Sequence, residues 1–307
     1  MAERAAVEGG HALIGRGAAL AAALLLPLAS HAASLRYCDR PLDLTPTQQD
    51  RLFRWGGVVR QALAAAAAPV ALVSRSGLDL QRFGLRYSHA GLALQASGNG
   101  PWSVRQLYFA CDEGRPRLFD QGLSGFLLGI DEADVGYLSI VVLPPDAAEA
   151  LAAAALDNRT ALGLLHPRYS ANAYAWGLDY QNCNQWVAEL MAAAWGGAAG
   201  SRPDAQAWLR NADYLPTAVQ VDSPWLRLAG WFVPYLHQLD HPAEARAAHR
   251  YEITMPASLE TFVRQRYPAA ERTEICHRGG RIVVHRGWSP VAEGCEPGPG
   301  DEVVLLD

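Results

Sequence analysis

The cysteines constrain this chain more than any other feature of its sequence. All five lie beyond an apolar N-terminal stretch, so the part of the chain that folds carries an odd number of thiols. Cysteines tend to pair in oxidising compartments, and an odd count leaves one thiol unpaired or shared with another molecule. The identity of that thiol decides what chemistry the chain can perform. The positions are Cys38, Cys111, Cys183, Cys276 and Cys295.

Residues 1–33 are predicted to be a Sec-type signal peptide. Arg4 and Arg16 precede an apolar stretch at 17–29, and small residues follow where signal peptidase requires them. The stretch is too short to cross ~30 Å of hydrocarbon as a helix, and no later segment reaches that length. A retained membrane anchor is the alternative. We expect a periplasmic or secreted protein with no transmembrane span once the leader is removed.

Composition excludes several classes of function. All 26 Lys-plus-Arg positions are arginine, which removes the phosphate-loop lysine and Schiff-base chemistry. The net charge is −5 and no basic run occurs, so we expect no nucleic-acid partner. No Cys-x-x-Cys pair is present, which removes the usual structural zinc patterns. We expect neither a metal nor a cofactor.

Apolar periodicity and turn residues predict a mixed fold of the α+β class. A helix begins at Thr45-Pro46, where a cap residue precedes a first-turn proline. The turn at 97–101 joins two strands into a hairpin. Further helices are expected at 145–156, 182–195, 205–210 and 258–266, and strands at 70–74, 86–94, 102–110, 135–143, 282–285 and 302–306.

The strand at 86–94 carries the first candidate catalytic residue. Because side chains alternate along a strand, His89 shares a face with Tyr87 and with two small residues, Gly91 and Ala93. Small neighbours leave space beside an imidazole, which a general base needs. A histidine packed in the core is the alternative.

The helix that follows Asn182 places Cys183 in its first turn. Free backbone N–H groups and the helix macrodipole favour a thiolate there and lower its pKa from ~8.5. The same N–H groups can stabilise an oxyanion. Gln181, Asn182 and Asn184 give the cysteine a polar setting, and with Tyr87 they are candidates for oxyanion or substrate contacts. A half-cystine or an inert packed thiol is the alternative.

One pairing of the cysteines would leave Cys183 free. Cys276 and Cys295 flank the last expected hairpin, and Cys38 and Cys111 could tie the N-terminal segment to the strand at 102–110. Another connectivity would use Cys183, and the spacing does not choose among the possibilities. The position at a helix start and the polar flanks favour Cys183 as the unpaired thiol.

Two short motifs carry a family resemblance. Ser88-His89-Ala90-Gly91 on a strand, followed much later by Asn-Cys-Asn-Gln-Trp-Val at 182–187, resembles the circularly permuted papain-like hydrolases. These are NlpC-type and YiiX-like relatives in which histidine precedes cysteine. The exported chain resembles more closely a bacterial family catalogued as domain of unknown function 2145. That family shares both motifs, Gly-Pro-Trp, and the tail Arg-Gly-Trp…Gly-Cys…Gly-Asp.

The resemblance implies a permuted papain-like core at 34–222, in which an antiparallel sheet packs on the cysteine-bearing helix. A C-terminal extension at 223–307 would carry a disulfide-closed hairpin. Cys183 would be the nucleophile and His89 the base, and a polar residue on the next strand would orient His89. Gln106 is the candidate for that position. Relatives often carry His, Glu or a polar residue there. Glutamine accepts a hydrogen bond from the ring without adding charge, so it would activate His89 less than a carboxylate would.

We therefore expect an exported thiol hydrolase or acyltransferase, an amidase, peptidase or acyl hydrolase. Its substrate would be an amide or ester bond of the cell envelope, in a peptidoglycan peptide, a lipid or a lipoprotein. The alternative is a non-catalytic envelope-binding or scaffolding protein with the same fold. The aromatic segment at 225–235 could line a groove or touch a membrane, although its apolar character favours core packing.

Overall fold

The computed structural model describes residues 44–130, 132–197 and 200–306. The predicted leader at 1–33 and the candidate half-cystine Cys38 lie outside these residues. Within the described ranges, no helix is both long and apolar enough to span a bilayer. The described residues belong to one compact unit.

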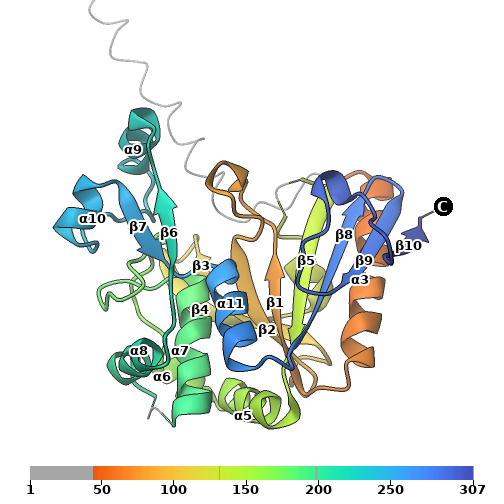
Figure 1. The fold of residues 1–307 in the computed structure, drawn as a ribbon, viewed down its shortest axis with the longest axis horizontal. Coiled ribbons are helices and arrows are strands. Elements are labelled where there is room, and N and C mark those ends of the chain that lie inside the picture. Colours follow the sequence, from red (N-terminus) through yellow and green to blue (C-terminus); the bar gives the residue numbers. More distant parts are fainter. Residues whose placement is uncertain (1–43, 131, 198–199, 307) are drawn as a thin grey trace, which may run out of the picture. The chain divides into compact units, whose positions relative to one another are not determined.

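Eight antiparallel strands form the central sheet (Figure 1), in the order β10-β9-β8-β5-β1-β2-β3-β4. This arrangement confirms the predicted α+β class. The hairpin at 97–101 and most expected strands are present, whereas β4 and β8 were missed. The bounds are β1 Val70–Arg75, β2 His89–Leu94, β3 Ser103–Ala110, β4 Arg115–Gln121, β5 Val135–Val142, β8 Glu271–Arg278, β9 Arg281–Arg286 and β10 Glu302–Leu305.

Helices cover both faces of this sheet. The core on one face includes residues of α5 (Pro145–Leu156), α7 (Cys183–Gly196) and α11 (Pro256–Arg266). The core on the other face includes residues of α3 (Pro46–Ala65) and α4 (Leu123–Leu127). Side chains of β2 alternate between the two cores, so that Leu92 packs toward α7 and Ala93 toward α3. The alternation decides which side of the sheet each candidate residue faces.

The chain beyond residue 223 contributes to the same sheet. β8 pairs with β5 along its full length, and β9 and β10 follow it. A separate two-stranded sheet joins β6 (Thr217–Gln220) to β7 (Arg250–Ile253). The remaining helices are α6 (Asn158–Gly163), α8 (Arg202–Asn211), α9 (Pro224–Gly230) and α10 (Ala243–Ala247).

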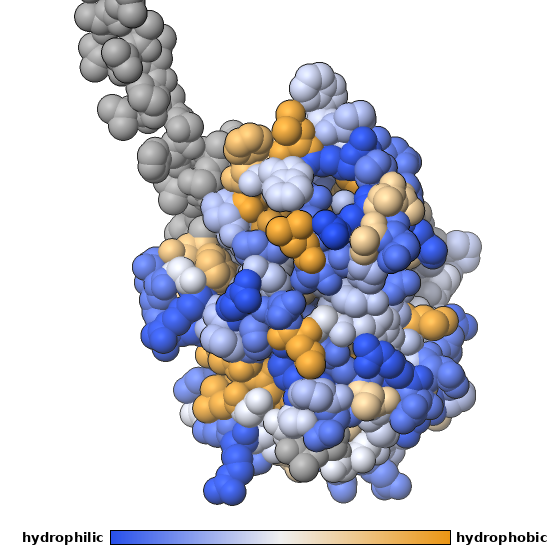
Figure 2. Space-filling view, turned by 90° about the vertical axis from the view of Figure 1, so that its left-hand side faces the viewer, coloured by the Kyte–Doolittle hydropathy of each residue, from blue (hydrophilic) through white to orange (hydrophobic). Residues whose placement is uncertain are grey.

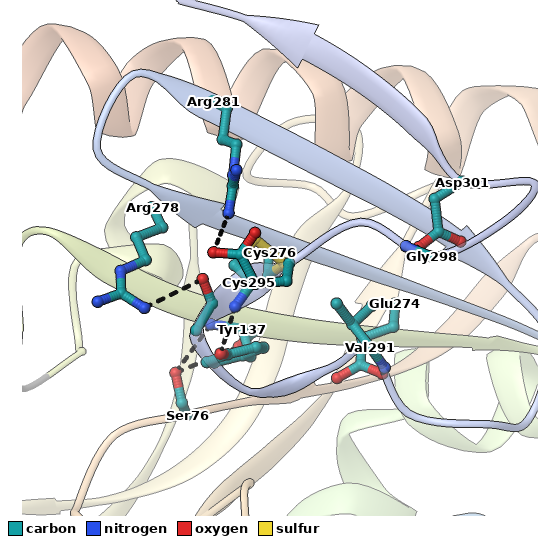
Figure 3. Close-up of a disulfide and its surroundings, with 12 residues drawn as sticks. Ser76, Tyr137, Glu274, Cys276, Arg278, Arg281, Val291, Cys295, Gly298 and Asp301 are labelled. Carbon is teal, nitrogen blue, oxygen red and sulfur yellow. Dashed lines mark hydrogen bonds and ion pairs between the residues drawn. A yellow bond between two sulfur atoms is a disulfide. The ribbon is translucent and has the colours of Figure 1, made fainter.

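The expected disulfide between Cys276 and Cys295 is present (Figure 3), with its Cα atoms 5.8 Å apart. It joins β8 to the short turn at Glu293–Cys295. The Tyr137 hydroxyl accepts a hydrogen bond from the Cys295 N–H at 2.9 Å, which ties the same turn to β5. Cys111 is also disulfide-bonded. Cys183 is the free cysteine of the described residues, as predicted.

Replacing Cys276 and Cys295 together by serine is expected to lower the free energy of unfolding by about 3 kcal/mol. The bond closes a loop across a sequence separation of 19 residues, and its loss frees the unfolded chain. Urea titration of both proteins under non-reducing conditions measures the difference. A midpoint unchanged from wild type would show that the turn is held without the bond.

Candidate active site

Cys183 is the first residue of α7, as the sequence predicted. Asn182 caps the helix by accepting a hydrogen bond from the Gln185 N–H at 2.7 Å. The backbone N–H groups of Cys183 and Asn184 and the Tyr169 hydroxyl hydrogen-bond to the thiol sulfur. These donors point at the position where negative charge would develop on sulfur or on an attacked carbonyl.

The protonation state of Cys183 differs from the expectation. Burial raises the pKa of this thiol to about 11, and the hydrogen bonds and the Arg75 charge offset only part of that rise. Its side chain lies in the core under the sheet, with 6% of the residue exposed. The predicted lowering of the pKa was therefore wrong for the resting protein, because desolvation outweighs the helix N-terminus.

Asn184 connects the cysteine helix to the histidine strand. Its side-chain oxygen accepts a hydrogen bond from the Ala90 N–H at 2.9 Å, and its amide donates to the Ser88 carbonyl at 3.2 Å. β2 pairs with β1 along its whole length but with β3 only over Leu92–Leu94, so the backbone of Ser88 and Ala90 has no strand partner on the β3 side. The Asn184 side chain replaces that partner. Because both of its polar atoms are bound, it positions the strand rather than contacting an oxyanion.

His89 and its predicted partner Gln106 lie in contact, with 2.5 Å between His89 Nε2 and Gln106 Oε1. The Gln106 amide donates to Gln121 at 2.6 Å, which leaves the Gln106 oxygen to accept. His89 must then carry its proton on Nε2, and Nδ1 keeps the lone pair of a base.

The surroundings of His89 keep its ring neutral. Burial lowers the pKa of His89 to about 3, and the positive charge of Arg75 adds to this effect. The ring lies against Tyr108 and Phe126, with centroid distances of 5.7 and 6.0 Å. At neutral pH the imidazole is therefore a free base, although a weak one.

A close approach of β3 explains a glycine beside His89. A Cβ built on Gly91 would lie 2.6 Å from a Val104 methyl and 3.3 Å from the Gln106 Cβ. The bare glycine lets β3 come near enough for the Gln106 side chain to reach the imidazole.

The Cys183 thiol and the His89 imidazole are connected only indirectly, through the Asn184 side chain. No hydrogen bond joins Cys183 to His89 in the described ranges, and their side chains belong to the cores on opposite faces of β2. Asn184 bridges the two elements at the gap between β2 and β3. The Arg75 charge acts on the pKa of both groups, so they share one electrostatic environment.

Two other candidate residues point elsewhere. The Gln181 side chain bonds to Glu189 at 2.5 Å and to the Leu164 carbonyl at 2.9 Å, in a buried network below the helix start. The Tyr87 hydroxyl donates to Glu274 at 2.5 Å. Sequence reasoning missed Arg75 as a neighbour of the site. For Tyr169 the only signal was its place in the loop before Cys183.

Two clefts flank residues 84–87, directly before the histidine strand. One has a volume of about 700 Å³ and is lined by Arg86 and Glu274, and the other has about 660 Å³ and is lined by Glu260 and Arg272. Cys183 lines neither of them. Within the described residues no cluster of His, Cys, Asp or Glu could hold a metal ion.

Three polar side chains near the C-terminus, Ser289, His285 and Asp301, are hydrogen-bonded in the sequence of a Ser-His-Asp triad. His285 contacts Asp301 through Nδ1 at 2.6 Å and Ser289 through Nε2 at 2.9 Å. Neither of the two clefts is lined by Ser289 or His285. These three side chains tie β9 to the chain on either side of the turn that holds Cys295.

Alkylation of Cys183 is expected to be slow at pH 7 and to accelerate up to about pH 11. The reason is the small thiolate fraction of a thiol whose pKa is raised by burial. Iodoacetamide labelling followed by peptide mass mapping gives the rate at each pH. The urea-unfolded, disulfide-intact protein is the control, since its thiol titrates near ~8.5. A maximal rate near pH 6 would contradict the neutral resting state and indicate a thiolate–imidazolium pair.

Comparison with protein families gives one match. A model described as "Uncharacterized protein conserved in bacteria (DUF2145)" matches residues 62–263, a range that includes His89, Gln106 and Cys183. No curated protein and no solved structure matches the chain.

Proposed function

We propose a function for this chain as a member of the bacterial family DUF2145, to which it belongs because the family model matches about two thirds of it. The proposal is an exported thiol hydrolase or acyltransferase with a permuted papain-like core. One observation carries it. An unpaired cysteine begins a helix whose next residue clamps the strand of a histidine, and a glutamine holds that histidine in the tautomer of a base.

The reaction would begin with both partners neutral. Cys183 and His89 lie apart in the resting structure, so the first step requires substrate binding to bring them within hydrogen-bond reach. His89 Nδ1 then accepts the thiol proton as the Cys183 sulfur attacks the carbonyl carbon of an amide or ester. The N–H groups of Cys183 and Asn184 stabilise the oxyanion. Return of the proton to the leaving amine or alcohol collapses the intermediate to a thioester. Attack on this thioester by water, or by an acceptor amine, releases the acyl group.

Two features shape the site for this chemistry. Tyr169 stays protonated because burial raises its pKa well above the usual value, so its hydroxyl is a hydrogen-bond donor to the sulfur. Gln106 stabilises an imidazolium less than a carboxylate would, because its amide carries no charge. We therefore expect slow turnover that depends on substrate binding to bring Cys183 and His89 together.

The test is the covalent intermediate. Purified protein is mixed with p-nitrophenyl acyl esters and with dansylated muropeptides, quenched in acid, and analysed by intact and peptide mass spectrometry. The expected result is one acyl adduct on the peptide that contains Cys183, together with product release. An adduct on any other residue, or release without an adduct, would overturn the proposal.

A non-catalytic envelope-binding protein is the second candidate. The burial of Cys183 and its raised pKa favour this function, because a packed structural thiol has the same properties. The two functions separate in the same experiment. A binding protein retains muropeptide or lipid in equilibrium dialysis, without forming an adduct or releasing product.

A further inference from the structure

The segment between β6 and β7 exposes large apolar side chains. We name as the α9 tip the five large apolar side chains on and after α9 that are more than half exposed. Hydrophobic residues are visible near the top of Figure 2, interspersed with hydrophilic ones. The expectation of core packing for this segment was wrong. The tip consists of Trp225 (78% exposed), Leu228 (52%), Trp231 (61%), Phe232 (79%) and Leu239 (68%).

The α9 tip is nearly free of charge. No acidic residue occurs between Asp222 and Asp240. The one formal charge in that interval is Arg227, whose guanidinium donates to the backbone carbonyls of Val221 and Asp222 at 3.1 and 2.8 Å. A partner of the tip would therefore be held by apolar and indole contacts and not by ion pairs.

We propose that the α9 tip docks this protein on the surface of a lipid bilayer. Tryptophan favours the membrane interface, since its ring is apolar and its N–H remains hydrated. Apolar side chains on a projecting segment can insert among lipid headgroups, whereas a rigid protein partner would have to offer a matching pocket.

The same segment leads to the candidate active site. The Tyr235 ring lies 5.6 Å from that of Phe109, and Phe109 stacks on Tyr169 at 5.3 Å. Tyr169 in turn hydrogen-bonds to Cys183. The Ala171 N–H donates to the Tyr235 carbonyl at 2.8 Å, so the segment that carries the tip is bound to the loop before the cysteine.

A bilayer held by the tip would therefore lie beside the loop that leads to Cys183. The substrate class that follows is an acyl ester or amide embedded in the membrane, a lipid or lipoprotein. This last step rests on the proposed thiol chemistry, whereas docking itself does not.

Vesicle flotation tests the docking. The probes are vesicles of phosphatidylcholine alone and of phosphatidylcholine with phosphatidylglycerol. Wild type is expected to bind both, with little change between low and high salt. Replacing Trp225, Trp231 and Phe232 by alanine is expected to weaken binding about 10²-fold, because each buried aromatic side chain contributes roughly a factor of ten or less. All variants keep the same N-terminus, so any contribution from residues 1–33 is constant.

A matched variant controls for loss of exposed apolar area. Phe53, Leu162 and Leu305 are also exposed, on α3, α6 and β10, and their replacement by alanine is expected to leave binding within about twofold of wild type. Equal binding by wild type and the tip variant would overturn the proposal. So would binding that requires phosphatidylglycerol and low salt, or a dimer that the tip variant dissociates with no vesicle binding by the monomer.

A further arm separates docking from chemistry. Cys183→Ala is expected to float with vesicles like wild type, so loss of turnover with retained flotation would reject only the thiol mechanism. The tip variant is expected to hydrolyse a soluble short-chain ester normally and to lose about 10²-fold on a vesicle-embedded acyl ester. Equal loss on both substrates would reject delivery from the membrane.

Discussion

Cys183→Ala is expected to reduce turnover to the level of buffer and to abolish the acyl adduct, because no other free thiol is present in the described residues. His89→Ala is expected to lower kcat/KM by about 10²–10⁴-fold, the usual contribution of a general base. The measurement is the initial rate on the best ester or muropeptide from the adduct experiment. Far-ultraviolet circular dichroism of each variant confirms the fold.

Gln106 provides the control for this prediction. Gln106→Ala removes the oxygen that accepts the hydrogen bond from His89 Nε2, and it removes the amide that donates to Gln121. We expect the loss of kcat/KM to be smaller than for His89→Ala. Gln106→Glu adds a charge that stabilises the imidazolium and is expected to raise the pKa of His89, visible as a shift of the acidic limb of the pH–rate profile. Turnover that survives both Cys183→Ala and His89→Ala would reject the site.

Glu274→Gln is expected to lower the free energy of unfolding by about 3–5 kcal/mol. The Glu274 carboxylate is fully buried and accepts from Arg86 at 2.8 Å, Arg272 at 3.1 Å and the Tyr87 hydroxyl at 2.5 Å. Removing its charge leaves two arginines without their common partner in the interior. Urea titration at pH 7 measures the change.

The pH dependence of this effect has a definite sign. Burial alone would raise the pKa of Glu274, but Arg272, Tyr87 and Arg86 outweigh it and hold that pKa below its usual value. Such a carboxylate stabilises the fold above its unfolded pKa and loses that contribution as pH falls through the folded value. The gap between wild type and Glu274→Gln should therefore close below about pH 4.

An exposed ion pair supplies the matched control. Glu302 bonds to Arg286 on the neighbouring strand, and both side chains are more than half exposed. Glu302→Gln is expected to change stability by about 1 kcal/mol or less, since solvent screens the pair. Similar losses for both variants would show that burial of the Glu274 network contributes nothing special.

Local sequence signals predicted much of the fold. Apolar alternation located β1 and β5, and the cap at Thr45-Pro46 located the start of α3, where Thr45 and Gln48 form a capping box. β4 was missed because it follows β3 after a short turn and alternates charged and apolar residues only weakly. The pairing of β8 with β5 joins residues 129 to 143 positions apart, which no local pattern indicates.

The candidate site also has some features that the sequence predicts and others that it does not. The helix start at Cys183 could be predicted because capping is a local property, and the contact of His89 with Gln106 was expected from the family resemblance. The high pKa of Cys183 could not, since it depends on how completely distant segments bury the thiol. The gap between β2 and β3 that Asn184 fills is likewise a property of the assembled sheet.

The burial of Cys183 also affects how readily oxidants react with its thiol. Peroxide attacks thiolates, and the irreversible steps to sulfinic and sulfonic acid follow from the first product. A neutral sulfur beneath the Tyr169 hydroxyl offers oxidants little to attack. The rate at which oxidants damage the Cys183 thiol is therefore expected to depend on how often the site opens as well as on the oxidant concentration.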